Sequence, residues 1–356
     1  MHIKCPHCNH LIQITASKVS SNKLYVFQWP SNLGGADTKL VHSLRLWSKF
    51  MQVTVVPNYE NQLKETKWTE YLTSLGISYC SFGELPEKLN GQAIAFSNPE
   101  YIGGERNIAQ KVHQRGLRTI WGNEMFFFFP GELDTIWQGF IDILVFPSKI
   151  NHNALMPTYK HSHSYIVENY IDADDFPYKA RPDRQFTIGR LSRPDTAKYP
   201  VSFPVFYERL GLKNPKYRVM AWSEEIASKY RWYSFGPEWD LLNPETETQL
   251  DFLYSLDAFV YPLGHTFIES WGRSTVEAML TGCVPVVQSG HNFRYLIDHG
   301  KTGFVCDYYE DFRNACQKLQ DDKALREEMG KRASMAAQVI CGPRRHTEIW
   351  KRVFDV

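Results

Sequence analysis

The 356-residue sequence lacks any run of 18 apolar residues, so it predicts no helix that spans a membrane. Its amino terminus lacks the basic segment followed by an apolar one that a secretory signal requires, and we expect a cytoplasmic location. An excess of one charge is also missing, because 40 Lys and Arg residues oppose 39 Asp and Glu residues. The net charge of +1 excludes a protein that coats nucleic acid through charge alone.

Cysteine is scarce, and its spacing is irregular. Seven cysteines, an odd number, are scattered along the chain, which is not the pattern of a disulfide framework and agrees with a reducing compartment. Only Cys5 and Cys8 have the spacing of a turn that places two thiolates on a zinc ion. No second such pair follows, so His161 and His163, or another chain, would have to complete the site. The sequence leaves two interpretations of Cys5 and Cys8 open, a structural zinc site and a pair of reduced thiols.

The sequence does have length and a regular alternation of segments. Its 356 residues are about twice a typical domain, which predicts two domains. Short apolar strands alternate with amphipathic segments, a pattern typical of α/β domains with parallel, doubly wound sheets. A polar, proline-bearing stretch at 169–183 indicates a linker between them. The expected strands are 24–27, 52–57, 93–96, 118–121, 141–146, 186–190, 217–220, 258–261 and 284–287.

The most informative window is 267–287. Seven residues separate Glu269 from Glu277, and a loop gives way to a helix between them. The free main-chain N–H groups at the start of a helix attract phosphate or developing negative charge. Here those groups belong to Gly272, Arg273 and Ser274.

This window resembles the retaining nucleotide-sugar glycosyltransferases of family 4, which have the GT-B fold. The two glutamates stand at the family's spacing within its frame of Phe, aromatic-Gly, Glu-Ala-Met, Gly and Pro-Val-Val, and residues 292–305 continue the likeness. The frame makes the resemblance specific, since two glutamates at this spacing are a weak signal alone. The resemblance implies two Rossmann-like domains that face a central cleft, with a carboxy-terminal helix crossing back to the first domain.

The resemblance also implies roles for these residues. Glu277 corresponds to the carboxylate that accepts both ribose hydroxyls of the nucleotide, and Glu269 to the residue that holds the hydroxyls of the transferred sugar. The N–H groups around Gly272, Arg273 and Ser274 would face the sugar and the phosphates. Arg273 departs from the family, where a small or apolar residue is commoner. A phosphate contact and a solvent-facing side chain are both open for it.

Two further loops carry residues suited to a diphosphate. Arg190 directly follows a strand and Lys198 comes eight residues later, and such cations would neutralise the leaving group. They resemble the family's Gly-Arg-Leu strand end and its following Lys, so we expect Glu269, Arg190 and Lys198 to be the catalytic residues. Gly34 and Gly35 precede a helix and resemble the family's glycine-rich loop, where the backbone can approach a ligand.

The acceptor side carries a weaker signal. Asn123 and Glu124 follow a strand and should project into the cleft, where many relatives have a His. An Asn can orient a hydroxyl but cannot act as a titrating base. No Asp-x-Asp element follows a strand, and Asp174 and Asp175 lie in the linker, so we expect catalysis without a metal or other cofactor.

The sequence divides into four parts. Residues 1–20 form an extension with the Cys5 and Cys8 turn, and 21–168 form an acceptor domain. Residues 169–342 form the donor domain, and 343–356 form the helix that returns to the first domain. No pattern indicates the oligomeric state.

The sequence thus predicts transfer of a hexose or pentose, with retention, from a nucleotide diphosphate sugar to a hydroxyl. A UDP-sugar is the favoured donor, and a glycan, a small molecule or a lipid-linked sugar is the expected acceptor. A hydroxymethylated base in DNA is an alternative acceptor, and an epimerase or a non-catalytic nucleotide-sugar binding protein is an alternative function. The local signals for DNA are Lys39, Arg45, Lys49, Arg115, Arg118 and the Cys5 and Cys8 turn.

Overall fold

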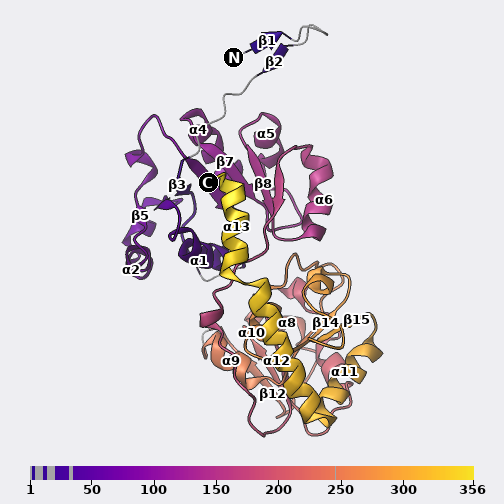
Figure 1. The fold of residues 1–356 in the computed structure, drawn as a ribbon. Helices are drawn as coiled ribbons and strands as arrows, with labels where there is room; N and C mark the ends of the chain where they lie inside the picture. Colours follow the sequence, from indigo (N-terminus) through magenta and orange to yellow (C-terminus); the bar gives the residue numbers. More distant parts are fainter. Residues whose placement is uncertain (1, 5–10, 14–20, 32–34, 245) are drawn as a thin grey trace.

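The computed structural model describes residues 2–4, 11–13, 21–31, 35–244 and 246–356. Two parallel sheets with helices packed around them form two bodies, one above the other in Figure 1. A separate antiparallel pair, β1 (His2–Lys4) and β2 (Leu11–Gln13), lies apart from both sheets. No helix in these ranges is long and apolar enough to cross a membrane.

The first sheet has seven parallel strands in the order β5-β4-β3-β6-β7-β8-β9. Strands β6 and β8 are buried along their whole length, and apart from Gln92 their residues are apolar, as expected for a sheet covered on both faces. The strands are β3 (Lys23–Val26), β4 (Gln52–Val55), β5 (Ser78–Tyr79), β6 (Gln92–Phe96), β7 (Arg118–Gly122), β8 (Ile143–Phe146) and β9 (Ser164–Ile166). The helices of this domain are α1 (Gly35–Trp47), α2 (Thr66–Ser74), α3 (Pro99–Ile102), α4 (Ile108–Gln114), α5 (Glu132–Trp137) and α6 (Lys149–Tyr159).

The second sheet has six parallel strands in the order β12-β11-β10-β13-β14-β15. In both sheets the first strand lies in the middle, the next two strands are added on one side of it, and the later strands on the other side. This is the Rossmann strand order, so the predicted fold class is confirmed. The strands are β10 (Thr187–Leu191), β11 (Lys216–Met220), β12 (Trp239–Leu242), β13 (Ala258–Tyr261), β14 (Val284–Gln288) and β15 (Phe304–Cys306). The helices are α7 (Phe203–Glu208), α8 (Glu224–Lys229), α9 (Gln249–Ser255), α10 (Arg273–Leu280), α11 (Tyr309–Asp321) and α12 (Lys323–Ile340).

The last helix, α13 (Pro343–Phe354), returns to the first domain and lies beside α1 in Figure 1. The break from α12 is made by Gly342 and by Pro343 at the first helical position, where a missing N–H costs nothing. Trp350 is fully buried and packs edge-on against Trp47, with ring centroids 4.9 Å apart. The predicted crossing helix is therefore part of the first domain's core.

His346 on this helix should make stability depend on pH. Its Nε2 lies 3.0 Å from the Ile340 carbonyl oxygen, and burial lowers its pKa to about 4 from 6.5. As the pH falls, His346 takes up a proton in the unfolded chain before it does so in the folded protein. The folded state is therefore most stable above pH 6.5 and loses stability as the pH falls toward 4. Between pH 7 and pH 4, we expect the free energy of unfolding to fall by about 2–3 kcal/mol more in the wild type than in His346→Gln.

Urea unfolding at several pH values measures this difference, and the many carboxylates common to both proteins cancel in it. Parallel pH profiles for the wild type and His346→Gln would contradict the prediction.

Candidate functional site

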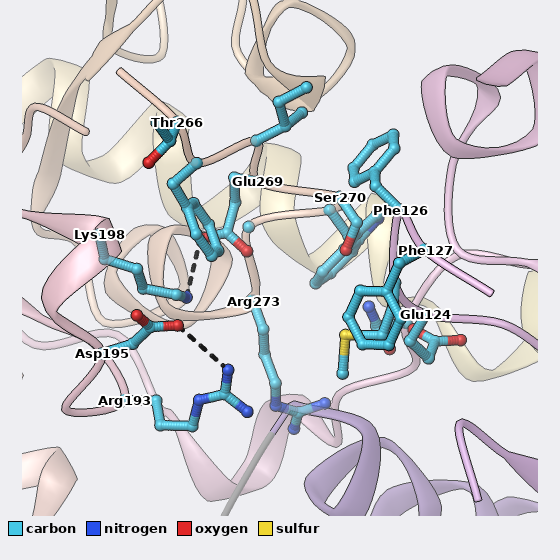
Figure 2. A pocket seen from close by; sticks show the side chains of 16 residues that line it. Glu124, Phe126, Phe127, Arg193, Asp195, Lys198, Thr266, Glu269, Ser270 and Arg273 are labelled. Carbon is cyan, nitrogen blue, oxygen red and sulfur yellow. Dashed lines mark hydrogen bonds and ion pairs between the residues drawn. The ribbon is translucent and has the colours of Figure 1, made fainter. Parts of the chain in front are cut away.

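A cavity of about 370 Å³ lies between the two domains, where the strands of both sheets end. The loop after β7 lines it from the first domain, and the loops after β10 and β13 line it from the second. Figure 2 shows Glu124, Phe126 and Phe127 on one side and Arg193, Asp195 and Lys198 on the other, with Glu269 and Arg273 between them. The first-domain lining is Glu124, Met125, Phe126 and Phe127, and the second-domain lining includes Arg193, Asp195, Lys198 and residues 266–273.

Glu269 and Lys198, two of the residues expected to bind the donor, meet in this cavity. Glu269 Oε2 accepts hydrogen bonds from Lys198 Nζ at 3.1 Å and from the Tyr261 hydroxyl at 3.0 Å. The Lys198 ammonium also lies 4.7 Å from the centre of the Phe267 ring. Each charged side chain is 13% exposed, so a ligand can reach both. The pair offers one anion and one cation at adjacent positions.

Gly272 shapes the start of α10 beside the cavity. Its φ of +94° is left-handed, and a Cβ there would lie 2.4 Å from the Phe293 ring, so only glycine fits. The cavity is lined by residues 270–273, which places the amino-terminal end of α10 against it. Ser274, one residue farther along the helix, does not belong to the lining.

Of the two placements left open for Arg273, the structure does not show the solvent-facing one, because its side chain is only 10% exposed. Its Nε donates to Glu277 Oε1 at 2.8 Å, one helical turn away, and its Nη1 lies 3.5 Å from the Tyr170 carbonyl oxygen. Gln249, at the first residue of α9, donates to the other carboxylate oxygen of Glu277. Burial raises the pKa of Glu277, and the Arg273 charge opposes that rise. Glu277 therefore lies beneath Arg273 and Gln249 and does not line the cavity.

Arg190 is a correction to the sequence analysis. The structure does not bring it to the cavity wall, where we expected it to face a diphosphate. Its guanidinium is fully buried beside the Tyr199 and Tyr261 rings, 3.9 Å and 4.5 Å from their centres. It donates to the Pro262 carbonyl oxygen at 2.8 Å and to that of Lys198 at 3.2 Å. These contacts make Arg190 a support for the loop that carries Lys198.

Asn123 is a second correction. We expected it to project into the cleft, but it is buried and absent from the cavity lining. Its Nδ2 shares its two hydrogens among three nearby acceptors, Glu132 Oε1 at 3.1 Å, the Tyr159 hydroxyl oxygen at 2.8 Å and the Phe127 carbonyl oxygen at 3.0 Å. Its Oδ1 accepts from the Met125 N–H. All of its polar atoms therefore hold the loop after β7 in place.

Glu132 completes this support and was missed by the sequence analysis. It is fully buried at the start of α5 and accepts hydrogen bonds from Trp121 Nε1 and from the Phe129 N–H, each at 2.6 Å. Burial raises its pKa, and the hydrogen bonds oppose that rise. Because Glu132 binds both Asn123 and Phe129, it closes the ends of the loop that lines the cavity.

Glu124 does reach the cavity, as expected. Its Oε1 lies 2.7 Å from Lys39 Nζ, and that ammonium also donates to the Val167 carbonyl oxygen at 3.2 Å. Lys39, on α1, is fully buried, and burial lowers its pKa while Glu124 opposes the fall. Lys39 is one of the local basic residues that favour a DNA acceptor, and its burial rules out a contact of its own with DNA. The signal missed was its place on the buried face of α1, with Ser43 four residues on.

Other predicted residues lie outside the cavity or outside the described part. Cys5, Cys8 and Gly34 lie outside the described residues, so zinc there stays a prediction, and Gly35 is the first residue of α1. The His161 ring contacts the Ile141 carbonyl oxygen at 3.0 Å and the His163 N–H at 3.1 Å. In the ranges that the structure describes, no three His, Cys, Asp or Glu residues are grouped to hold a metal.

Two Rossmann-ordered sheets that share a cavity at their carboxyl ends, with the last helix returned to the first domain, define the GT-B fold. Residues 234–335, which include α10 and both glutamates, match the family described as glycosyl transferases group 1. The second domain thus carries a glycosyltransferase group 1 sequence within a GT-B fold. No curated protein matches the sequence significantly.

Solved structures with this fold cover nearly the whole chain. The Anabaena protein HepE in complex with UDP-glucose is 13% identical, with a TM-score of 0.75 over 94% of this chain and 100% of that one. A glycosyltransferase from Rickettsia africae is 10% identical, with a TM-score of 0.72 over 93% and 98%. Sucrose-phosphate synthase from Thermosynechococcus elongatus is 11% identical, with a TM-score of 0.69 over 94% and 98%. At these identities the likeness establishes the fold.

Proposed function

We propose that this protein is a retaining glycosyltransferase that moves a sugar from a UDP-sugar to a hydroxyl acceptor without a metal. The observation that carries the proposal is the ion pair of Lys198 and Glu269 at the start of α10, inside a cavity lined by both domains. A carboxylate suits sugar hydroxyls, and a cation beside a helix start suits a diphosphate. The family match of residues 234–335 and the UDP-glucose complex of HepE support this choice.

The donor half would act on the leaving group. Lys198 and the N–H groups at the start of α10 stabilise the negative charge that forms on the diphosphate when its bond to the anomeric carbon breaks. The acceptor oxygen bonds to that carbon from the same face, and its proton passes to the departing phosphate oxygen. Glu269 holds the sugar hydroxyls during this exchange. The protein's contribution is thus positioning and charge stabilisation.

Nucleotide binding would replace the hydrogen-bond partners of the Glu277 carboxylate. The two ribose hydroxyls donate to this carboxylate in place of Arg273 and Gln249. Arg273 already lines the cavity, and its buried Nη2 has no hydrogen-bond partner within the described residues. Once released from Glu277, the Arg273 guanidinium can add charge to the diphosphate site.

The domain limits are part of the same proposal. We assign 21–168 to the acceptor domain, 169–342 to the donor domain and 343–356 to the returning helix. The chain crosses between domains near Tyr170 and again near Gly342, so closure about these two crossings would exclude water from the donor.

The test is incubation of the full chain with UDP-, GDP- and ADP-sugars, with release of the nucleoside diphosphate as the readout. We expect release from a UDP-sugar, no change on adding EDTA, and a product whose anomeric configuration by NMR equals that of the donor. An inverted product would contradict retention. Recovery of an epimerised nucleotide sugar would indicate an epimerase, and binding without turnover would indicate a binding protein.

A further inference from the structure

The first-domain wall of the cavity combines one exposed aromatic ring, Phe127, and one half-buried ring, Phe126, with a single carboxylate, Glu124. From it we infer that the acceptor is an uncharged sugar ring, which stacks on Phe126 and Phe127 and donates a hydroxyl to Glu124. This wall would exclude phosphorylated sugars and nucleic acid. The inference rests on the proposed function and deepens it by naming the acceptor class.

The aromatic part is a fixed apolar surface. Phe127 is 55% exposed although it lines a cavity, and Ile268, from the opposite domain, is 49% exposed. The Phe127 ring packs against that of Phe129, 5.2 Å away, and Phe129 packs edge-on against the buried Trp121. Exposed apolar surface that is held rigid in a cavity indicates a ligand with an apolar face. One face of a pyranose ring presents such C–H groups to aromatic rings.

The polar part is a hydrogen-bond acceptor. Glu124 lies next to Phe127 in Figure 2, and the buried Lys39 fixes its position through Oε1. Its own N–H donates to Ser97 Oγ at 2.9 Å, which orients the backbone as well. An ionised carboxylate can only accept hydrogen bonds, so its ligand must donate them. A sugar hydroxyl beside an apolar ring face satisfies both parts of this surface.

The distribution of charge excludes anionic acceptors. The cations that line the cavity are Arg193, Lys198 and Arg273, and all three come from the second domain. The first-domain wall, Glu124, Met125, Phe126 and Phe127, carries a negative charge and no cation. Lys39 behind it is buried and already paired with Glu124. A phosphate on this side would meet the Glu124 carboxylate, and none of the four wall residues is a cation that could bind it, whereas nucleic acid binding depends on cationic contacts to phosphates.

The experiment compares three acceptor groups in the presence of a panel of UDP-sugars. They are the methyl glycosides of glucose, galactose, mannose and N-acetylglucosamine, the 6-phosphates of the same glycosides, and duplex DNA that contains hydroxymethylcytosine. UDP release above the acceptor-free rate gives kcat/KM, and titration calorimetry gives UDP binding. We expect at least one neutral glycoside to be used, its 6-phosphate to be at least tenfold poorer, and DNA to be inert.

Two variants connect this specificity to the wall. Phe127→Ala should lower kcat/KM for the neutral acceptor about tenfold, because the sugar ring loses the aromatic surface on which it stacks. Glu124→Gln should lower it by a similar factor and reduce the discrimination against the 6-phosphate. The matched controls are Trp137→Ala, an equally exposed aromatic on α5, and Glu87→Gln, an exposed carboxylate, and both should behave as wild type.

Every outcome of the experiment either supports or overturns the inference. Preferred use of a 6-phosphate or of DNA overturns the inference. It is also overturned if UDP binds and the donor is hydrolysed while no neutral glycoside is used, and the donor half of the proposed function then stands. If no UDP-sugar is bound or consumed, the proposed function fails and the inference falls with it.

Discussion

Lys198→Met is expected to lower kcat for sugar transfer by about 10²–10³-fold, the effect of removing one group that stabilises developing negative charge. Within the described residues, Lys198 is the only cation that forms an ion pair with Glu269, and both residues line the cavity. Without it, the Glu269 carboxylate would face the departing diphosphate uncompensated. Methionine keeps the length of the side chain over the Phe267 ring. The measured quantity is kcat for UDP release with a saturating acceptor.

The variant should remain folded, because main-chain bonds hold this loop. Arg190 donates to the Lys198 carbonyl oxygen and Lys229 Nζ donates to that of Thr196, and neither bond involves the replaced side chain. Lys213→Met removes a lysine that is 82% exposed and outside the cavity, so it is the control for loss of charge. A kcat for Lys198→Met within threefold of the control would contradict the proposed role.

Glu277→Gln is expected to weaken UDP binding by about 10–100-fold. Hydrogen bonds to a charged group contribute about 1.5–3 kcal/mol, and the two ribose hydroxyls would lose their ionised acceptor. Glutamine has nearly the same volume, so the packing of α10 is kept. The Kd for UDP, measured by titration calorimetry, tests this expectation. Glu310→Gln, an exposed carboxylate on α11, is the control and should bind UDP as wild type does.

A nucleotide analogue separates the ribose contact from a general loss of structure. The wild type should bind the 2′,3′-dideoxy analogue of UDP as weakly as Glu277→Gln binds UDP, because both lack the same hydrogen bonds. Glu277→Gln should in turn bind UDP and the analogue with nearly equal affinity. If the variant still prefers UDP by the wild-type factor, the ribose hydroxyls are bound elsewhere.

Local patterns predicted the fold well. Apolar runs of four or five residues mark buried parallel strands because both faces of such a sheet are covered by helices. Gly272 could be placed at a helix start because the loop, the glycine and the helix are contiguous in sequence. The strands near 24, 93, 118, 187 and 284 all lie within the two sheets. The meeting of Lys198 with Glu269 followed from their place after β10 and β13, which pair in the second sheet.

The positions and contacts of individual side chains were predicted less well. Arg190 lies near the end of β10 and Asn123 directly follows β7, as ligand-binding residues would, yet both are buried as supports. Their partners are set by distant segments: Arg190 contacts Pro262, 72 residues away, and Asn123 contacts Tyr159, 36 residues away. Arg273 likewise turns toward Glu277 and Tyr170 rather than toward solvent. No local pattern encodes such partners.

The sequence by itself determined the two Rossmann-like domains, the returning helix and the presence of a carboxylate and a lysine after neighbouring strands. These features depend on periodicity, caps and motif spacing, which are local. Only the tertiary structure decided which polar groups reach the cavity and which are used to build it. That choice depends on the free energy of burying each group, and burial of Arg190, Asn123 or Lys39 is offset by hydrogen bonds that it donates to distant residues.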